Sequence, residues 1–353
     1  GLIDAGVELR REWASVDGER RVAGPSGVVE ASHVVLATGA RPIVPDVSGL
    51  DRPEVWTSAD ALADSELPDR LLIVGGGPVG CELAQVYRRF GTSVTLIDHG
   101  DTVLGDVEPT VARGLETVLR EDGIDVRLGF ELRAVDDAAS GGIEASFAGI
   151  GTGSVVVDRL LLAVGVQPRL SDVGLDTIGL DSERVEIGDD GAVGGLDWLW
   201  AIGDSTPTSK WTHGASYQAR ALADRLRGEA WPTSPSIMPR CVLTVPPVGA
   251  VGTTAEAARA AGHDVVVGRG HYEDSVRAAT DEVERGEFAV VVDRPSGRLL
   301  GASGDGPRAD DIVQIATALM VAGADIDLAA RTVFPFPTYS QVLEQALREA
   351  RNR

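Results

Sequence analysis

The chain has 353 residues, 43% of them hydrophobic, and a formal net charge of −22. This acidic excess excludes a phosphate-backbone partner, so no nucleic acid is expected. No apolar run reaches the roughly 18 residues of a membrane helix and no leader opens the chain, which predicts a cytoplasmic protein without a membrane partner. Cys81 and Cys241 fit no metal or redox spacing, so no metal site is expected.

The first elements are short strands. They are expected over residues 7–16 and twice within residues 20–29. A buried apolar strand then begins at residue 33 and ends in the small-residue turn Ala37-Thr38-Gly39, where a backbone can approach a ligand closely. A helix follows over residues 58–65, with Thr57 or Ser58 as its N-cap.

The clearest chemical signal comes next. Four apolar residues, 71–74, predict a short buried strand, and Gly75, Gly77 and Gly80 then fill the pattern G-x-G-x-x-G before a helix that starts near Pro78. The first glycine permits the tight turn, the second lets a pyrophosphate approach the backbone, and the third lets helix and strand pack closely. The free N–H groups at the helix start would bind that pyrophosphate.

A second strand, residues 93–97, leads to Asp98, which lies 18 residues after Gly80. A carboxylate there accepts hydrogen bonds from ribose hydroxyls and repels a 2′-phosphate, so NADH is expected in preference to NADPH. The alternative to dinucleotide binding is an ordinary βαβ turn. Cys81 in the intervening helix is interpreted as a buried packing residue rather than a reactive thiol.

The middle of the chain repeats the pattern of a buried strand followed by a small-residue turn. We expect a helix at 108–121, a strand at 124–128, a hairpin region at 135–157 and a strand at 158–164 before Gly165. A further strand, 198–202, runs into Gly203 and Asp204 and precedes a helix over 212–227. Asp204 either reaches a ribityl or ribose hydroxyl or caps a turn, and the residues alone leave both open.

A domain linker is expected at residues 231–236, which are rich in proline and serine. Beyond it the pattern predicts an α+β domain. Its expected elements are a strand around Cys241, a helix over 254–261, a strand over 264–267, a hairpin of 288–293 with 298–301, an apolar helix over 309–322 and a last helix through 348.

Seven motifs in a fixed order give the chain its resemblance. They are Ala37-Thr38-Gly39, the run from Gly75 to Glu82, Ala163-Val164-Gly165, Ala201-Ile202-Gly203-Asp204, Thr212-His213-Gly214-Ala215, Thr244-Val245-Pro246-Pro247 with Val251-Gly252-Thr253-Thr254, and Pro337-Thr338-x-Ser340. In this order they resemble the class I pyridine-nucleotide disulfide oxidoreductases, the family of dihydrolipoamide dehydrogenase and mercuric reductase.

The resemblance implies an α/β fold with Rossmann-like FAD- and NAD(P)-binding domains and a C-terminal α+β dimerisation domain. The implied domains are FAD-binding at 1–68 and 166–232, NAD(P)-binding at 69–165, and a domain at 233–353 that forms a homodimer. The implied FAD contacts are Thr38, Gly39, Gly203, Asp204, Thr212, His213 and Ala215. The implied NAD contacts are Gly75, Gly77, Pro78, Val79, Gly80, Glu82, Asp98 and Gly165, with Glu82 beside the nicotinamide.

Two departures from the family shape the functional hypothesis. The family's first FAD glycine loop and its redox cysteine pair precede the region that Gly1 matches, so the chain resembles an N-terminally truncated copy. Phe336 and Gln341 stand where the family has its acid–base histidine and glutamate, and neither can move a proton. No catalytic side chain is therefore assigned.

From these departures we expect an FAD-dependent NAD(P)H oxidoreductase that reduces a quinone, a metal ion or a nucleotide rather than a disulfide. One alternative is a non-catalytic dimeric module that binds NAD as a sensor. The other is a dihydrolipoamide dehydrogenase-like disulfide reductase whose cysteines lie upstream.

Overall fold

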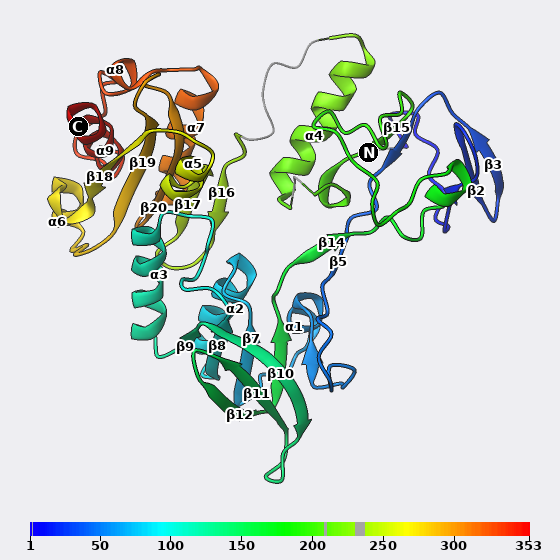
Figure 1. Cartoon of the computed structure of the whole chain (residues 1–353), viewed down its shortest axis with the longest axis horizontal. Helices are drawn as coiled ribbons and strands as arrows, with labels where there is room; N and C mark the ends of the chain where they lie inside the picture. The colour runs from blue at the N-terminus through cyan, green and yellow to red at the C-terminus, as the bar shows by residue number, and fades with distance from the viewer. Residues whose placement is uncertain (2, 208–209, 230–236) are drawn as a thin grey trace. The chain divides into compact units, whose positions relative to one another are not determined.

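The computed structural model describes residues 1, 3–207, 210–229 and 237–353. The chain divides into two compact units, the first made of Gly1–Arg41 with Val166–Pro235 and the second of Pro42–Gly165 with Ser236–Arg353 (Figure 1). Each unit is therefore assembled from two separate stretches of chain. Among the described residues, no helix is both long enough and apolar enough to cross a membrane.

Two adjacent parallel strands organise the first unit. They are β4 (Val34–Leu36) and β15 (Leu199–Ala201), which pair along their whole length and so end at the same edge. Their buried side chains form a core with residues of the segment 170–198. The other elements are β1 (Ser15–Val16), β2 (Arg21–Gly24), β3 (Gly27–Glu30), β5 (Ala40–Pro42) paired with β14 (Val166–Pro168), η1 (Leu175–Ile178), η2 (Gly203–Ser205) and α4 (Thr212–Leu226).

The second unit contains a five-stranded parallel sheet in the order β6-β13-β7-β8-β9. Its central strand β7 is apolar and almost fully buried, as expected for a parallel sheet covered on both faces. The strands are β6 (Val55–Trp56), β7 (Arg70–Val74), β8 (Ser93–Asp98), β9 (Asp125–Leu128) and β13 (Arg159–Leu162), and the helices beside them are α1 (Ser58–Ala63), α2 (Pro78–Arg89) and α3 (Pro109–Glu121).

An antiparallel three-stranded sheet completes this part of the second unit. It consists of β10 (Phe130–Asp137), β11 (Ile143–Gly149) and β12 (Thr152–Val157), and its apolar face packs on β7 and β13. Helix α1 begins at Thr57, whose side chain forms a capping box with Asp60. Of the two expected N-caps, the structure therefore selects Thr57.

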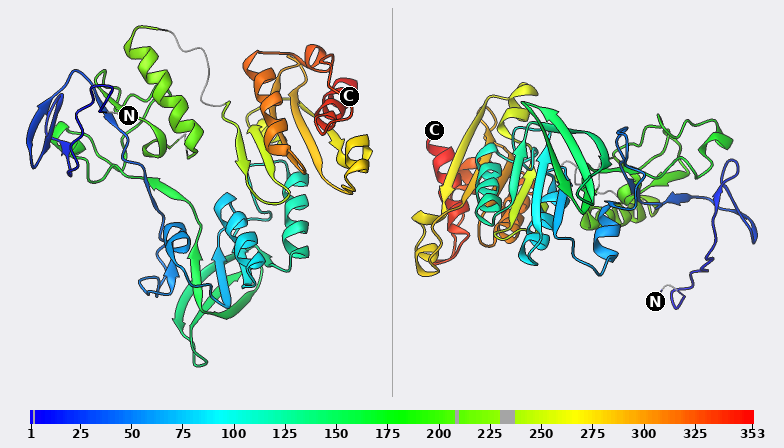
Figure 2. Two further views of the ribbon diagram at one scale, coloured as in Figure 1. Left: turned by 180° about the vertical axis from the view of Figure 1, so that it is seen from behind. Right: turned by 90° about the horizontal axis from the view of Figure 1, so that it is seen from below.

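The C-terminal part of the second unit is a five-stranded antiparallel sheet in the order β16-β17-β20-β19-β18. Helices α7 and α9 pack on one face, and α3 and α5 lie against the other (Figure 2). The elements are β16 (Arg240–Val242), β17 (Val248–Gly252), α5 (Ala255–Ala260), β18 (Val265–His271), η3 (Tyr272–Asp274), α6 (Val276–Thr280), β19 (Glu287–Asp293), β20 (Leu299–Asp305), α7 (Ala309–Val321), α8 (Ile326–Ala329) and α9 (Gln341–Asn352).

The sequence interpretation differs from the structure in several places. Residues 7–14 form no strand, because the alternating Val7 and Leu9 remain exposed and bury no face. Residues 42–68, expected with the FAD-binding segment, fall in the second unit, where β6 extends the parallel sheet beside β13. The elements β17, α6 and α8 were not anticipated. The expected linker at 231–236 lies outside the described residues.

Candidate functional site: a dinucleotide loop and a flavin edge

The glycine loop after β7 has a separate physical requirement for each of its three motif glycines. Gly75 has φ +112°, and a Cβ there would lie 2.5 Å from the carbonyl oxygen of Ala163. A Cβ on Gly80 would lie 1.8 Å from the carbonyl oxygen of Gly75. A Cβ on Gly77 would meet nothing within 4 Å, so this glycine faces open space where a ligand can approach the backbone.

The start of α2 offers an anion site at this loop. Gly77 is the N-cap and supplies no side-chain hydrogen bond, while Pro78 occupies the first turn. The N–H groups of that turn thus have no capping side chain, and Val79 is exposed beside them. Gly165, with φ +110°, follows β13 at the same edge of the sheet. These residues fit a pyrophosphate.

Asp98 lies at the end of β8, next to the glycine loop. Its two carboxylate oxygens accept hydrogen bonds from the backbone N–H of Gly76 at 2.6 Å and of Gly100 at 2.7 Å. Each oxygen keeps a further lone-pair direction for a ribose hydroxyl. The side chain is 14% exposed, whereas the neighbouring His99 ring is largely exposed and approaches Asp98 to 3.5 Å. Backbone donors therefore fix the carboxylate in place.

Two polar side chains of α2 bind a segment of the C-terminal part. Glu82 Oε1 accepts from the backbone N–H of Leu243 at 2.7 Å. Gln85, which is buried, accepts from the Val245 N–H at 2.8 Å and donates to the Val245 carbonyl at 3.0 Å. The sequence analysis did not identify the role of Gln85. The available signal was a glutamine among the apolar positions of this helix.

The cysteine in α2 is a packing residue. Cys81 is fully buried, its Sγ lies 3.3 Å from the Gly76 carbonyl oxygen, and burial raises the pKa of its thiol well above the usual range. Cys241 in β16 is half-buried, and burial raises its pKa as well. Neither residue has the stabilised thiolate that a reactive cysteine requires.

In the first unit, two turns meet at the carboxyl edge of β4 and β15. The Thr38 hydroxyl donates to the Arg169 carbonyl at 2.7 Å, and the Gly39 carbonyl accepts from the Arg169 N–H at 2.9 Å. Gly203 has φ +67° and begins the turn that carries the partly buried Asp204. Ligands of open α/β sheets bind at this edge.

Helix α4 starts beside the Gly203 turn. A Cβ on Gly203 would lie 3.1 Å from the Cβ of Ala215, so helix and turn are in close contact. The Gly203 N–H donates to Gln218 Oε1 at 2.7 Å, a contact that the sequence did not suggest. Thr212 and His213 occupy the first turn of α4, and the His213 ring stacks on Trp211 with a 6.0 Å centroid separation. All seven expected flavin residues therefore surround one strand edge.

The tail loop before α9 is held by its own hydroxyl and amide groups. Thr338 Oγ1 donates to the Pro335 carbonyl at 2.8 Å, and Gln341 Oε1 accepts from the Thr338 N–H at 3.4 Å. Tyr339 donates its phenolic hydrogen to Asp281 at 2.5 Å. The Phe336–Pro337 bond is cis, and Phe336 is 69% exposed. Phe336 therefore fills no pocket of its own chain.

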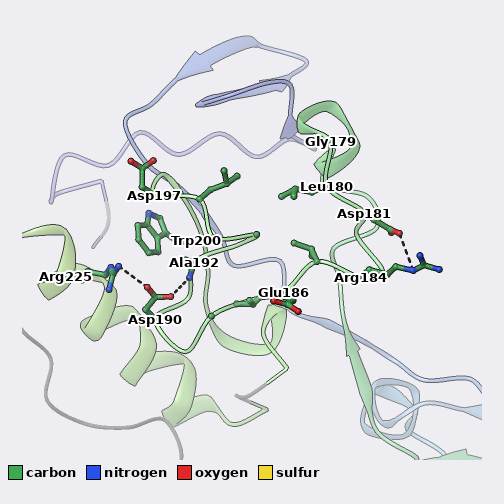
Figure 3. A pocket seen from close by; sticks show the side chains of 16 residues that line it. Gly179, Leu180, Asp181, Arg184, Glu186, Asp190, Ala192, Asp197, Trp200 and Arg225 are labelled. Carbon is green, nitrogen blue, oxygen red and sulfur yellow. Dashed lines mark hydrogen bonds and ion pairs between the residues drawn. The ribbon is translucent and has the colours of Figure 1, made fainter.

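A hollow of about 720 Å³ in the first unit holds none of the expected flavin residues (Figure 3). Its two arginines are both paired, Arg225 with Asp190 at 2.9 Å and Arg184 with Asp181 at 3.7 Å, and Glu186 and Asp197 give the lining an acidic excess. Within the described ranges, no group of three or more histidine, cysteine or acidic residues is placed to hold a metal ion.

Comparison with known proteins agrees with this geometry. Residues 2–219 match the family model "Pyridine nucleotide-disulphide oxidoreductase", and residues 238–347 match its dimerisation domain. The dihydrolipoyl dehydrogenase of Halobacterium salinarum is 34% identical over 98% of this chain and 74% of its own length. The mercuric reductase of Streptomyces lividans is 31% identical over 92% of this chain and 69% of its own length. The HOCl-induced flavoprotein disulfide reductase RclA of Escherichia coli superimposes with a TM-score of 0.84 at 25% identity, over 98% of this chain and 80% of its own.

Fold and loop together define a dinucleotide-dependent oxidoreductase. The chain belongs to the pyridine nucleotide-disulphide oxidoreductase family, whose members are FAD-dependent and use NAD(P)H. The resemblance drawn from the ordered motifs is confirmed, and so is the α/β fold class with its C-terminal dimerisation domain.

Proposed function

We propose that this protein passes hydride from NADH to FAD and then electrons to an acceptor that is not a disulfide. The observation that carries the proposal is the tail loop, where Phe336 is exposed and Gln341 binds the Thr338 backbone instead of orienting a proton carrier. A thiolate leaving group needs such a proton carrier. A quinone, a metal ion or a second nucleotide takes electrons from a flavin without one.

The nicotinamide coenzyme would be held by the glycine loop. The N–H groups at the start of α2 would bind its pyrophosphate, with Pro78 and Val79 in the first turn. Asp98 would accept hydrogen bonds from the hydroxyl groups of the adenosine ribose. Because its carboxylate would repel a 2′-phosphate, NADH would bind in preference to NADPH. The hydrogen bond from Leu243 uses Oε1 of Glu82. The other oxygen, Oε2, would accept a hydrogen bond from the nicotinamide carboxamide. Gly165 would line the other side of the loop.

The flavin would be held at the edge of β4 and β15. Among the described residues no partner bonds the partly buried Asp204 carboxylate, which suits it to the ribityl hydroxyls. Thr38 and Gly39 would border the isoalloxazine, with Thr212, His213 and Ala215 beside it. Bound flavin supplies the two-electron and one-electron chemistry, while these residues orient it and limit water access.

We also propose a homodimer through residues 233–353. Helix α7 buries Ile312, Val313 and Ala316 in its own domain but leaves Val321 and Ala318 exposed on the outer side. A two-fold contact would cover this side and bring the exposed Phe336 towards a partner's flavin. Light scattering at micromolar concentration should give twice the chain mass, and a monomer would contradict the dimer. A cytoplasmic location remains part of the proposal.

The acceptor is tested by parallel assays with NADH as donor on the flavin-loaded protein. A benzoquinone should be reduced at least tenfold faster than lipoamide, and Phe336→Ala should slow the quinone reaction because the ring supplies a flat apolar surface. Val333→Ala is the matched control, since Val333 is 91% exposed on the same segment. Lipoamide turnover equal to quinone turnover and unchanged in Phe336→Ala would contradict the proposal.

A second candidate is dithiol–disulfide chemistry, which the names of the dihydrolipoyl dehydrogenase relatives favour. In that case Phe336→His, which restores a proton carrier at the tail, should raise lipoamide turnover selectively. The same variant should leave quinone turnover unchanged or lower it if the first candidate is right.

A further inference from the structure

An arginine-lined cavity of about 560 Å³ lies in the second unit between α3, α5 and β18. Five arginines line it against two glutamates, in a chain whose net charge is −22. The arginines are Arg113, Arg259, Arg269, Arg294 and Arg353. Acidic residues just outside the lining pair with three of these arginines, so the capacity to bind an anion depends on the arginines that have no such partner.

The five arginines differ in whether their guanidinium groups form ion pairs with the described residues. Arg269 pairs with Glu287 at 3.2 Å, Arg294 approaches Asp264 to 3.5 Å, and Arg353 pairs with Glu349. Among the residues that the structure describes, the guanidinium groups of Arg113 and Arg259 make no ion pair or hydrogen bond. They come from α3 and α5, so they can bind one ligand from two directions.

Two acidic side chains, Glu108 and Glu256, also line the cavity, and neither forms an ion pair with Arg113 or Arg259 among the described residues. Glu108 is the N-cap of α3 but makes no capping bond to its own helix. It is buried, and its Oε1 accepts from the Ala255 N–H at 2.6 Å. The first-turn N–H groups of α3 lie beside the lining residues Pro109 and Thr110 and have no side-chain cap, although the Thr110 hydroxyl donates to Glu287 Oε1 at 2.5 Å.

We infer that this cavity is a second anion site, separate from the glycine loop, that binds a small phosphorylated metabolite through Arg113 and Arg259. Two guanidinium groups from different helices and a helix start match the several oxygens of a diphosphate better than a single carboxylate. Val265 and Val267 form the apolar floor on β18 and give the ligand no further polar partner. The size lies within the range of small-molecule sites.

Titration calorimetry of the flavin-loaded protein with inorganic pyrophosphate tests the site. The Arg113→Gln/Arg259→Gln double variant should bind at least tenfold more weakly, since each arginine contributes charge-assisted hydrogen bonds. Arg120→Gln is the matched control: it lies on the same helix but pairs with Glu116 at 2.8 Å, and should bind like the wild type. Unfolding temperatures equal to that of the wild type would show that all three variants are folded.

Three results would overturn the inference. Unchanged affinity in the double variant would place the pyrophosphate elsewhere, for example at the glycine loop. An equal loss in Arg120→Gln would show attraction by surface charge alone. Tighter binding of citrate than of pyrophosphate would contradict the phosphate assignment. NADH affinity should be the same in all variants, so this outcome is separate from that of the proposed oxidoreductase activity.

Discussion

The glycine loop and the tail loop are both short irregular segments next to a helix. Their conformations are fixed by different kinds of contact. In the glycine loop, the backbone itself fills the space, since a Cβ on Gly75 or Gly80 would strike a carbonyl oxygen. In the tail loop, the conformation is fixed by side-chain hydrogen bonds of Thr338, Gln341 and Tyr339.

The difference explains which part of the family pattern this chain keeps. A loop built from backbone contacts admits almost no substitution, so its backbone geometry, which we propose binds the pyrophosphate, is kept as a unit. A loop held by side chains keeps its path as long as the holding groups remain. Under the proposed function, Phe336 replaces a proton carrier there while the loop stays in place.

The largest effect is expected for Gly80→Ala. Its Cβ would lie 1.8 Å from the Gly75 carbonyl oxygen, so we expect the free energy of unfolding to fall by more than about 3 kcal/mol, as measured in urea. Gly77→Ala is the matched control, because nothing lies within 4 Å of its added Cβ. That control should keep its stability but bind NADH at least tenfold more weakly, and unchanged binding would contradict the role of Gly77.

The next effect concerns the junction between α3 and β20, which links the nucleotide-binding sheet to the domain that carries the tail loop. Asp305 is buried there, 3% exposed, and accepts from the Glu287 N–H at 3.2 Å. The pKa of its carboxyl is raised to about 7, mainly by burial and also by the charges of Glu287 and Glu273, while the bond from the Glu287 N–H opposes the rise.

The raised pKa of Asp305 fixes the sign of its pH dependence. Below about pH 4 both folded and unfolded states are protonated, and between pH 4 and 7 only the folded state keeps the proton. Its contribution therefore destabilises the fold progressively across this window, by an upper limit of roughly 4 kcal/mol. Asp305→Asn should gain stability relative to the wild type between pH 4 and 7 in urea titrations. A constant difference between the two proteins would contradict this expectation.

A smaller effect tests coenzyme choice at the glycine loop. Asp98→Ala removes the carboxylate that we propose repels a 2′-phosphate, so the proposed preference for NADH over NADPH should narrow about tenfold. Fluorescence titration with both coenzymes gives the ratio. Asp101→Ala is the matched control, since Asp101 is an exposed acid three residues away. A wild-type preference for NADPH would show that Asp98 does not select the coenzyme.

The smallest effect is expected in the tail loop. Tyr339→Phe removes the hydrogen bond to Asp281 but leaves the ring contact with Tyr272 at 5.8 Å. The unfolding temperature should fall by only about 1–2 °C, because the lost bond is exposed. A larger fall in Tyr339→Phe than in Gly80→Ala would reverse the comparison of the two loops.

The sequence predicted best where one residue type has one physical reason. The spacing of Gly75, Gly77 and Gly80 predicted the loop, and the apolar runs of β7, β8 and β15 predicted buried strands, because burial and backbone sterics act locally. Of the strand expected over residues 7–16, only residues 15–16 form one, because alternation alone does not supply a partner surface for the rest.

Contacts between distant segments could not be predicted. Gln85 binds Val245 across 160 positions, and nothing local to α2 names that partner. The same holds for Gln218 at Gly203 and for the burial of Asp305 against Gly114. The tail loop was predictable only in part. Its departure from the family motif was visible in the sequence, whereas the hydrogen bond between Gln341 and Thr338 was seen only in the structure.

The hydrogen bonds from α2 to residues 243–245 also determine how this part of the chain exchanges with solvent. The amides of Leu243 and Val245 donate to side chains of α2 rather than to a neighbouring strand. Their deuterium uptake therefore follows the opening of the nucleotide-binding helix and not that of the C-terminal sheet. Two amides far along the chain thus serve as native reporters of α2, and coenzyme binding at the helix start should slow their exchange.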